Sequence, residues 1–357
     1  MTAKEFDLLC IGNALVDVFA DGDEHSFARY GLHYPAMHIE MEKLKTILSD
    51  LGGGTVITSG GGAANAAKIA GFLGARVCFI GAVGREQTNE TAEPDEFGKL
   101  FIKDLSAAGV KLKLSLKPSP TGICLYLKAG AVTRIAASPS AALLLTEGDI
   151  NENEIQKARL VLIDGFMLGR PGLVQQLLAL AAKSGAAAAL DLSSKAIASE
   201  HAMECLEYAE NQNLILFMNE AEAASFHKAV TSGKTETFRE GKENKKFPPR
   251  ETYKFFQSLT EGKKFPIIVV ELGARGAICF AEGAVHQADT RALIPKDSAG
   301  AGGAFCAAFL AAWLRNKTIS ECAALGNKAA GIILNATGTQ VKGKLLIELG
   351  TIMTEKQ

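Results

Sequence analysis

The residues best suited to chemistry form a small-residue turn, Asp297-Ser298-Ala299-Gly300-Ala301-Gly302-Gly303-Ala304-Phe305. Apolar residues then recur at the spacing of one helix face: Phe305, Ala308, Phe309, Ala312 and Trp313. We therefore expect a helix from about Gly302, with free amides at its start on Gly300, Ala301, Gly302 and Gly303. Such an end binds anions, because unpaired N–H groups and the positive end of the helix dipole meet there. The alternative is a glycine-rich turn that only allows close packing against a strand.

Asn13 and Asp17 form a second group of candidate ligand residues. They follow Phe6-Asp7-Leu8-Leu9-Cys10-Ile11, a short apolar run that predicts a buried strand. Open α/β sheets place ligands at the carboxyl ends of their strands, so both side chains are candidates for binding a small molecule. The alternative is that both residues satisfy the backbone of a turn, which is a common use of Asn and Asp.

A further glycine-rich stretch precedes an Ala-rich helix that we predict from Ala63 to Leu73. Gly61 and Gly62 lack side chains, so they would let a ligand approach the backbone. Asn65 lies on the first turn of this helix and could point at such a ligand. The alternative is a helix start that needs only the unusual backbone angles of glycine.

Size and composition predict a soluble, cytoplasmic protein with a large core. The chain has 357 residues, 38 basic and 39 acidic, so its charge gives no reason to expect nucleic acid or an anionic membrane as partner. Its seven cysteines are scattered without a C-x-x-C pair, which indicates buried thiols. We expect no signal peptide and no membrane span, because no apolar run approaches the roughly 20 residues that cross a bilayer.

Strand-like and helix-like segments alternate along most of the chain. The predicted buried strands are 77–80, 160–163, 187–190, 214–218 and 267–270, and the predicted helices include 63–73 and 171–183. This order favours an α/β protein with a mostly parallel sheet and helices on both faces. A predicted hairpin, 121–127 with 132–136, interrupts the alternation and suggests a small flap or lid.

One highly charged segment, 228–250, contains almost no apolar residues. Such a composition buries too little apolar surface to order itself, so we predict a solvated surface insertion. The alternative is a loop whose basic side chains reach a phosphate group of a bound ligand.

These motifs resemble those of the ribokinase-like (PfkB) family of sugar and nucleoside kinases, over almost the whole chain. The first family signature is a glycine pair at a helix start, followed by a strand and two more glycines, here from Gly61-Gly62 to Gly81 and Gly84. Its acidic-x-x-Gly element is displaced to Asp95-Glu96-Phe97-Gly98 by a polar loop. The second signature, D-T-x-G-A-G-D-x-F, is matched by 297–305.

The resemblance implies a three-layer α/β/α fold with a mostly parallel central sheet and a small β lid. We expect one domain, 1–357, whose lid comes from about 15–55 and 111–141. The substrate would lie between lid and sheet, and lid closure would exclude water. We expect a monomer or a homodimer.

On the acceptor side, the resemblance implies that a small sugar or nucleoside is held through its hydroxyls by Asn13, Asp17, Gly61, Gly62 and Asn65. The segment 12–17, Gly-Asn-Ala-Leu-Val-Asp, is most similar to the adenosine-kinase-like branch, which favours a ribose-bearing substrate. In that branch a lid arginine meets phosphate, and Arg134 stands at its position.

On the nucleotide side, Asn219 and Glu222 are similar to the family's N-x-x-E, which positions Mg²⁺ and the phosphates of ATP through water. Gly273 and Gly276 look like its Gly-x-x-Gly, although Glu271 stands where Thr is usual. The resemblance also implies that Asn327 lies on the helix beside the adenine. It implies that Asp297 helps to place a monovalent cation such as K⁺.

Gly303 departs from the family pattern, because members carry there an Asp that takes the proton from the acceptor hydroxyl. A positioned base contributes typically ~10²–10⁴-fold to rate, so we predict that ligand binding is kept and turnover is weak or absent. An engineered change, a natural pseudoenzyme and a substitute base all remain open.

Two function classes therefore stand side by side: an impaired ATP-dependent kinase, and a non-catalytic binding or regulatory protein on the same fold. A Rossmann dehydrogenase is disfavoured because no G-x-G-x-x-G follows the first strand. A P-loop kinase is disfavoured because the chain has no G-x-x-x-x-G-K-[ST].

Overall fold

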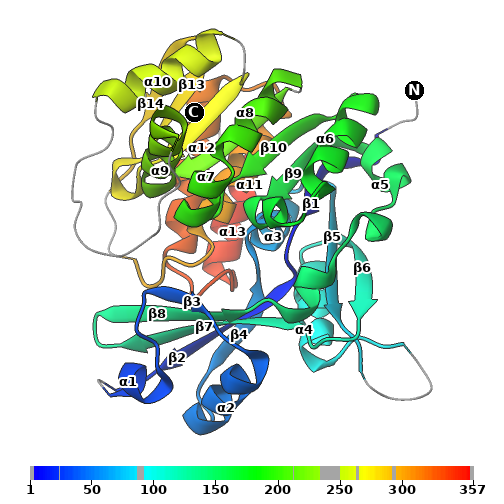
Figure 1. Ribbon diagram of the computed structural model, residues 1–357, viewed down its shortest axis with the longest axis vertical. Coiled ribbons are helices and arrows are strands. Elements are labelled where there is room, and N and C mark those ends of the chain that lie inside the picture. The colour runs from blue at the N-terminus through cyan, green and yellow to red at the C-terminus, as the bar shows by residue number, and fades with distance from the viewer. Residues whose placement is uncertain are drawn as a thin grey trace.

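The computed structural model describes residues 4–23, 25–86, 92–211, 213–233, 250–262, 265–291 and 295–353. Within them, nine strands form a large sheet and five form a small sheet that runs across one end of it (Figure 1). None of the helices in these ranges combines the length and the apolar character needed to cross a bilayer. All seven cysteines are buried free thiols, as their scattered spacing predicted.

The large sheet has the strand order β14-β13-β12-β11-β10-β9-β1-β5-β6. Pairings from β6 to β12 are parallel, and only the pairings of β13 with β12 and with β14 are antiparallel, so the sheet is mostly parallel as predicted. Its strands are β1 (Phe6–Ile11), β5 (Val77–Gly84), β6 (Lys111–Lys117), β9 (Ala158–Asp164), β10 (Ala187–Asp191), β11 (Leu214–Asn219), β12 (Ile267–Glu271), β13 (Ala277–Ala281) and β14 (Ala284–Ala288).

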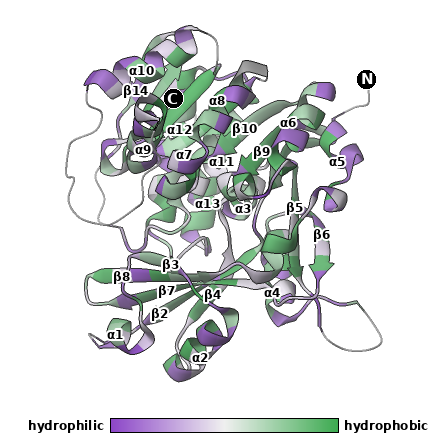
Figure 2. Ribbon diagram, in the orientation of Figure 1, coloured by the Kyte–Doolittle hydropathy of each residue, from purple (hydrophilic) through white to green (hydrophobic). Residues whose placement is uncertain are grey.

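Helices cover both faces of this sheet. Leu8 and Cys10 of β1 enter one apolar core, while Leu9 and Ile11 enter the other, because successive side chains of a strand point to opposite faces. The apolar strands lie between helices with polar outer faces (Figure 2). The first face carries α3 (Gly62–Phe72), α4 (Glu96–Ala107), α11 (Ala301–Trp313), α12 (Ile319–Ile333) and α13 (Lys344–Thr351); the second carries α5 (Glu152–Gln156), α6 (Leu173–Lys183), α7 (Lys195–Glu200), α8 (Ala202–Asn211), α9 (Glu220–Ser232) and α10 (Arg250–Glu261).

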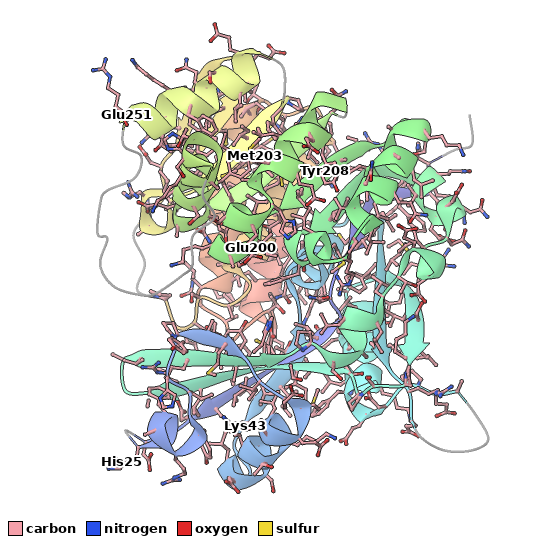
Figure 3. All side chains as sticks on the ribbon, viewed as in Figure 1. His25, Lys43, Glu200, Met203, Tyr208 and Glu251 are labelled. Carbon is pink, nitrogen blue, oxygen red and sulfur yellow. The ribbon has the colours of Figure 1, made fainter. Side chains whose placement is uncertain are left out.

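The small sheet has the order β3-β8-β7-β2-β4. Its helices α1 (Ser26–Tyr30) and α2 (Met41–Leu51) lie on the side away from the large sheet, where His25 and Lys43 are labelled (Figure 3). Its strands are β2 (Leu15–Asp21), β3 (Ala36–His38), β4 (Val56–Gly60), β7 (Gly122–Ala129) and β8 (Val132–Ser138).

Two predicted boundaries of this small sheet need correction. We placed 111–141 in the lid, but β6 pairs with β5 in the large sheet, so the second lid segment begins at β7. We ended the first segment at residue 55, but β4 pairs with β2 and extends that segment to Gly60. In β6, charged and apolar residues alternate because it is an edge strand with one exposed face, which made it look like part of the hairpin.

The charged segment 228–250 is only partly described. Its first residues complete α9, which ends at Ser232, and Arg250 begins α10. Residues 234–249, the centre of the predicted insertion, lie outside the described residues.

Candidate active site

At the start of α11 the amides of Gly302 and Gly303 have no backbone partner within the described ranges, whereas the Ala301 amide donates to the Ser298 carbonyl at 3.4 Å. Gly300 precedes the helix in the left-handed region, with φ at 80°, and no side chain of the described residues caps this end. The first i→i−4 hydrogen bond of the helix is donated by the Ala304 amide to the Gly300 carbonyl, at 3.0 Å. The helix thus begins at Ala301, one residue before the predicted position. Residues 300–303 are partly exposed, so the amides of Gly302 and Gly303 are accessible to an anion.

The same turn is also a packing contact between helices. A Cβ atom on Gly303 would lie 3.2 Å from the Ala66 nitrogen and from Cβ of Asn65, and 3.3 Å from the Gly62 carbonyl oxygen. The starts of α3 and α11 are therefore so close that a side chain at position 303 would require a shift of a few tenths of an ångström. The close-packing role that we considered for this turn operates here, although the partner is a helix rather than a strand.

Asp297 does not cap α11. Its Oδ1 accepts a hydrogen bond from the Ala299 amide at 3.1 Å, and its Oδ2 accepts one from the Gly338 amide at 2.8 Å. The carboxylate therefore joins the turn before α11 to the segment after α12. This position leaves the amides at the helix start available to a ligand.

Asp17 and Asn65 lie beside this helix start. A Cβ atom on Gly300 would lie 3.8 Å from the Asn65 amide nitrogen, and Thr339 donates to the Asn65 oxygen at 3.1 Å. Asp17 is 2% exposed. Burial, and secondly the charge of Asp297, raises the pKa of Asp17 to about 7, while Lys68 and the Asn65 side chain oppose the shift.

Gly61 brings the start of α3 against the end of β1. Its φ is 101°, and a Cβ atom there would lie 2.2 Å from the Asn13 carbonyl oxygen, so only glycine fits. Arg170 in turn donates to the Asn13 side chain at 2.7 Å. The structure thus brings together the predicted acceptor-site residues Asn13, Asp17, Gly61, Gly62 and Asn65 with the start of α11.

Asp164 is a further candidate site residue, which the sequence analysis missed. Its Oδ1 accepts hydrogen bonds from the Phe166 amide and the Ser193 hydroxyl, both at 3.0 Å. Its Oδ2 is buried, has no hydrogen-bond partner among the described residues, and would lie 3.3 Å from a Cβ on Gly62. Burial raises the pKa of Asp164. Asp164 ends β9, so the rule that selected Asn13 could also have found it.

Three further carboxylates follow along the same sheet edge, on Asp191, Glu222 and Glu271. Burial is the main cause that raises the pKa of each, and Glu222 and Asp191 raise the pKa of Glu271 further. Glu271 reaches α11, because a Cβ on Gly302 would lie 3.5 Å from its Oε2. A divalent cation near this edge would favour the ionised carboxylates.

Asn219 and Glu222 form a capping box at the start of α9. The Asn219 amide group and backbone donate to Glu222 at 2.7 and 2.8 Å, and Asn219 Oδ1 accepts from the helix. No group of three or more ligating side chains is arranged to hold a metal in the described part of the chain.

The predicted nucleotide residues lie between β12, β14 and α12. Gly273 begins a 3₁₀ turn and Gly276 follows it, and a Cβ on Gly276 would lie 2.0 Å from the Ala288 carbonyl oxygen. Asn327 on α12 donates to that same carbonyl at 2.8 Å. Gly276 and Asn327 thus hold the end of β14 beside the turn.

Among the described residues, no hydrogen bond or ion pair links Arg134 to the start of α11. It lies on β8 of the small sheet, with its guanidinium 5.0 Å from the centre of the Phe27 ring. Its Nε and Nη1 are buried, with no hydrogen-bond partner in the described ranges.

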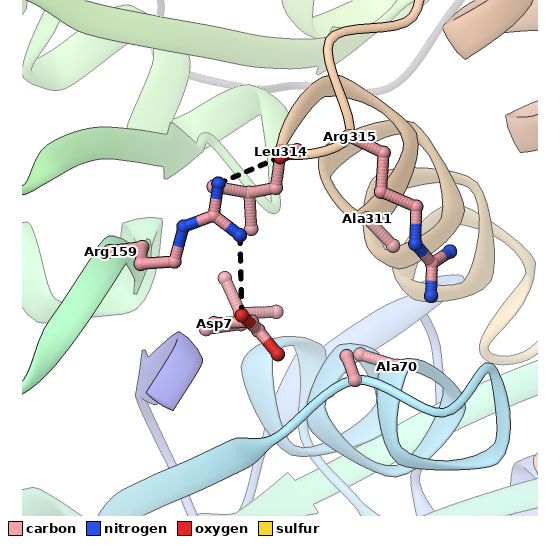
Figure 4. Close-up of a pocket in the computed structure, with 8 residues that line it drawn as sticks. Asp7, Ala70, Arg159, Ala311, Leu314 and Arg315 are labelled. Atoms are coloured by element: carbon pink, nitrogen blue, oxygen red, sulfur yellow. Dashed lines mark hydrogen bonds and ion pairs between the residues drawn. The ribbon is translucent and has the colours of Figure 1, made fainter. Parts of the chain in front are cut away.

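A cavity of about 70 Å³ lies at the opposite ends of the strands, near the starts of β1 and β9 (Figure 4). Its Arg159 donates to Asp7 at 3.3 Å and to the Leu314 carbonyl at 2.8 Å. A hydrogen bond from Arg76 is the main cause that lowers the pKa of Asp7 to about 2. The charges of Asp7 and Arg159 are therefore paired with each other. Because the cavity lies at the opposite ends of the strands, it is separate from the candidate active site.

Comparisons with known proteins identify relatives of this chain in sequence and in structure. A family model described as pfkB family carbohydrate kinase matches residues 36–344. The chain is 26% identical to Adenosine kinase 2 of Arabidopsis thaliana, over 93% of this chain and 94% of that protein. It is similar in structure to adenosine kinase from Sinorhizobium meliloti, with TM-score 0.79, 22% identity and coverage of 96% and 98%. Adenosine kinase from Schistosoma mansoni in complex with 2-fluoroadenosine gives TM-score 0.78, 20% identity and coverage of 96% and 98%. The family resemblance and the predicted fold are confirmed.

Proposed function

Because the chain belongs to the pfkB family of carbohydrate kinases, we propose that it transfers the γ-phosphate of ATP to a hydroxymethyl group of a nucleoside or ribose-like sugar. Adenosine is the acceptor we favour, because the relatives reported above are adenosine kinases. The observation that carries the proposal is the uncapped start of α11 beside the buried Asp17 and Asn65.

In this proposal each group acts by position or charge. The amides at 300–303 stabilise the charge on the transferred phosphoryl group, which is the main catalytic requirement of such transfers. Asp17, Asn65 and Asn13 hold acceptor hydroxyls, while Gly61 and Gly62 keep the backbone open to them. The small sheet, 15–60 with 122–138, closes over the acceptor and excludes water.

The nucleotide would lie along the edge formed by β11, β12 and α12. Mg²⁺ bound with ATP would neutralise phosphate charge, and Asn219 and Glu222 would meet it through water. The other assignments kept as part of the proposal are Gly273, Gly276 and Asn327 at the nucleotide, Arg134 at phosphate after lid closure, and Asp297 near a monovalent cation such as K⁺.

We propose slow transfer, because Gly303 offers only its N–H and no proton acceptor. The second candidate function, ligand binding without catalysis, is favoured by the same observation and by the close packing of Gly303 against α3. Cytoplasmic location and assembly as a monomer or homodimer remain predictions.

Calorimetric titration and a phosphorylation assay on the same samples test this proposal. ATP with Mg²⁺ and each of adenosine, ribose and fructose are titrated separately, and product formation is then followed over hours. We expect ATP·Mg²⁺ and at least one acceptor to bind, with slow product formation. Binding with no product at all supports the non-catalytic function. The absence of ATP·Mg²⁺ binding would refute the kinase function, and the absence of binding by ATP·Mg²⁺ and by every acceptor would refute both functions.

A further inference from the structure

Lys68 is a buried charge that the proposed mechanism does not yet use. It lies on α3 and is 4% exposed. Its Nζ donates to the hydroxyls of Thr58 and Ser59, each at 3.2 Å, and lies 3.3 Å from Oδ2 of Asp104. A buried ammonium is costly unless it is paired and hydrogen-bonded, so this arrangement needs all of its partners.

Asp104 of α4 completes the network. Its Oδ2 also accepts from the Thr58 hydroxyl at 3.1 Å and from the Ser59 amide at 2.9 Å. Both residues belong to β4, which is an edge strand of the small sheet. The Lys68–Asp104 pair therefore attaches the edge of the small sheet to two helices that pack on the large sheet.

This attachment lies directly beside Asp17. Thr58 is the cross-strand partner of Asp17, and the Asp17 carboxylate covers the backbone of Gly60, where a Cβ would lie 2.1 Å from Oδ1. Asn65, whose side chain lowers the pKa of Asp17, lies one helical turn before Lys68 on the same face of α3. One face of α3 thus supplies both Asn65 and Lys68 to the surroundings of Asp17.

The charges around Asp17 have opposing effects. Burial and Asp297 raise the pKa of Asp17, whereas Lys68 lowers it; Cys124 and Tyr126 of β7 also face this carboxylate. Burial is the main cause that lowers the pKa of Lys68, Lys342 lowers it further, and Asp104 and Asp17 oppose the shift.

We propose that Lys68 is a positioning residue of the acceptor site, which fixes β4 against α3 and holds Asp17 in its ionised, hydrogen-bond-accepting form. The inference rests on the proposed function, since it assigns the acceptor hydroxyl to Asp17. An ionised carboxylate accepts hydrogen bonds at both oxygens, whereas a protonated one must donate at one of them.

The test titrates adenosine into parent, Lys68→Met, Lys68→Arg and Asp104→Asn proteins between pH 6 and pH 9, with ATP·Mg²⁺ titrated into the same samples. Removing a positive charge raises the pKa of a nearby acid, so Lys68→Met should bind adenosine about tenfold more weakly near pH 7 and recover at higher pH. Lys68→Arg should keep most of the affinity. Asp104→Asn removes the carboxylate that keeps the buried Lys68 charged, so it should weaken adenosine binding in the same direction as Lys68→Met. ATP·Mg²⁺ affinity should stay within about twofold throughout.

Several outcomes would overturn the inference. A pH-independent loss of adenosine affinity in Lys68→Met, or an equal loss of ATP·Mg²⁺ affinity, would indicate a purely structural role. Unchanged adenosine affinity in a folded Lys68→Met would exclude the role while leaving the proposed function intact. If the parent binds ATP·Mg²⁺ but neither adenosine nor any sugar, both the proposed function and the inference about Lys68 fail. Thermal melts of each variant show whether the protein folds. If Lys68→Met is unfolded, a large loss of adenosine affinity in a folded Lys68→Arg would overturn the inference.

Discussion

The Gly303→Asp variant should phosphorylate the acceptor about 10²–10⁴ times faster than the parent chain, the usual contribution of a positioned general base. The carboxylate would stand at the start of α11, beside the phosphate and near Asn65. Ligand affinities should change little, because the binding groups are already in place. Initial rates of ADP formation with saturating ATP·Mg²⁺ and adenosine measure the effect.

Packing gives this experiment a matched control. A Cβ on Gly303 approaches two backbone atoms of α3 at 3.2–3.3 Å, so helix α11 must shift by a few tenths of an ångström. Gly303→Ala introduces the same crowding without a carboxylate, and each variant should lose about 1–3 kcal/mol of unfolding free energy. Only Gly303→Asp should gain activity. An equal rate in both variants, with a parent that turns over well, would show that Gly303 is not the position of a missing base.

The Gly61→Ala variant should lose at least about 2 kcal/mol of unfolding free energy, and acceptor binding with it. The backbone region of Gly61 costs about 1–3 kcal/mol for other residues, and its new Cβ would meet the Asn13 carbonyl oxygen at 2.2 Å. Relief of that contact moves α3 away from β1, and therefore separates Asn13 from Asn65. Urea unfolding and adenosine titration measure the two losses.

Gly74 offers the control at the other end of the same helix. Its φ is 79°, but nothing lies within 4 Å of a Cβ placed there. Gly74→Ala should therefore cost only the left-handed backbone conformation, roughly 1–2 kcal/mol, and keep adenosine affinity. Similar losses of stability and affinity in both variants would contradict the assigned contact between Gly61 and Asn13.

The buried parallel strands could be predicted because they are short apolar runs with a polar or glycine residue at the carboxyl end. The run 160–163 became β9, and 214–218 became β11, each within a few residues of the expected bounds. Residues 111–117 were assigned to the wrong sheet, because an alternating pattern shows one exposed face but not the neighbouring strand. The partner of an edge strand is decided by tertiary packing.

Residues of the candidate site could be predicted where they belong to a local motif. Residues whose partners are distant in sequence could not. Glycine-rich helix starts identified 300–303 and Asn65, and the end of a predicted strand identified Asn13. Arg170 contacts Asn13 across 157 positions, and Lys68 meets Asp104 across 36, so no local spacing indicates either contact. A lysine in an Ala-rich helix also looks solvent-facing until the strand that covers it is placed.

The central claim is that the start of α11 holds the phosphate that is transferred. A crystal structure of the chain with Mg²⁺, adenosine and a non-hydrolysable ATP analogue tests it most directly. We predict that the terminal phosphate accepts hydrogen bonds from the amides of Gly302 and Gly303, with the acceptor hydroxymethyl group facing it. A terminal phosphate bound elsewhere, with these amides bonded only to water or protein, would contradict the account.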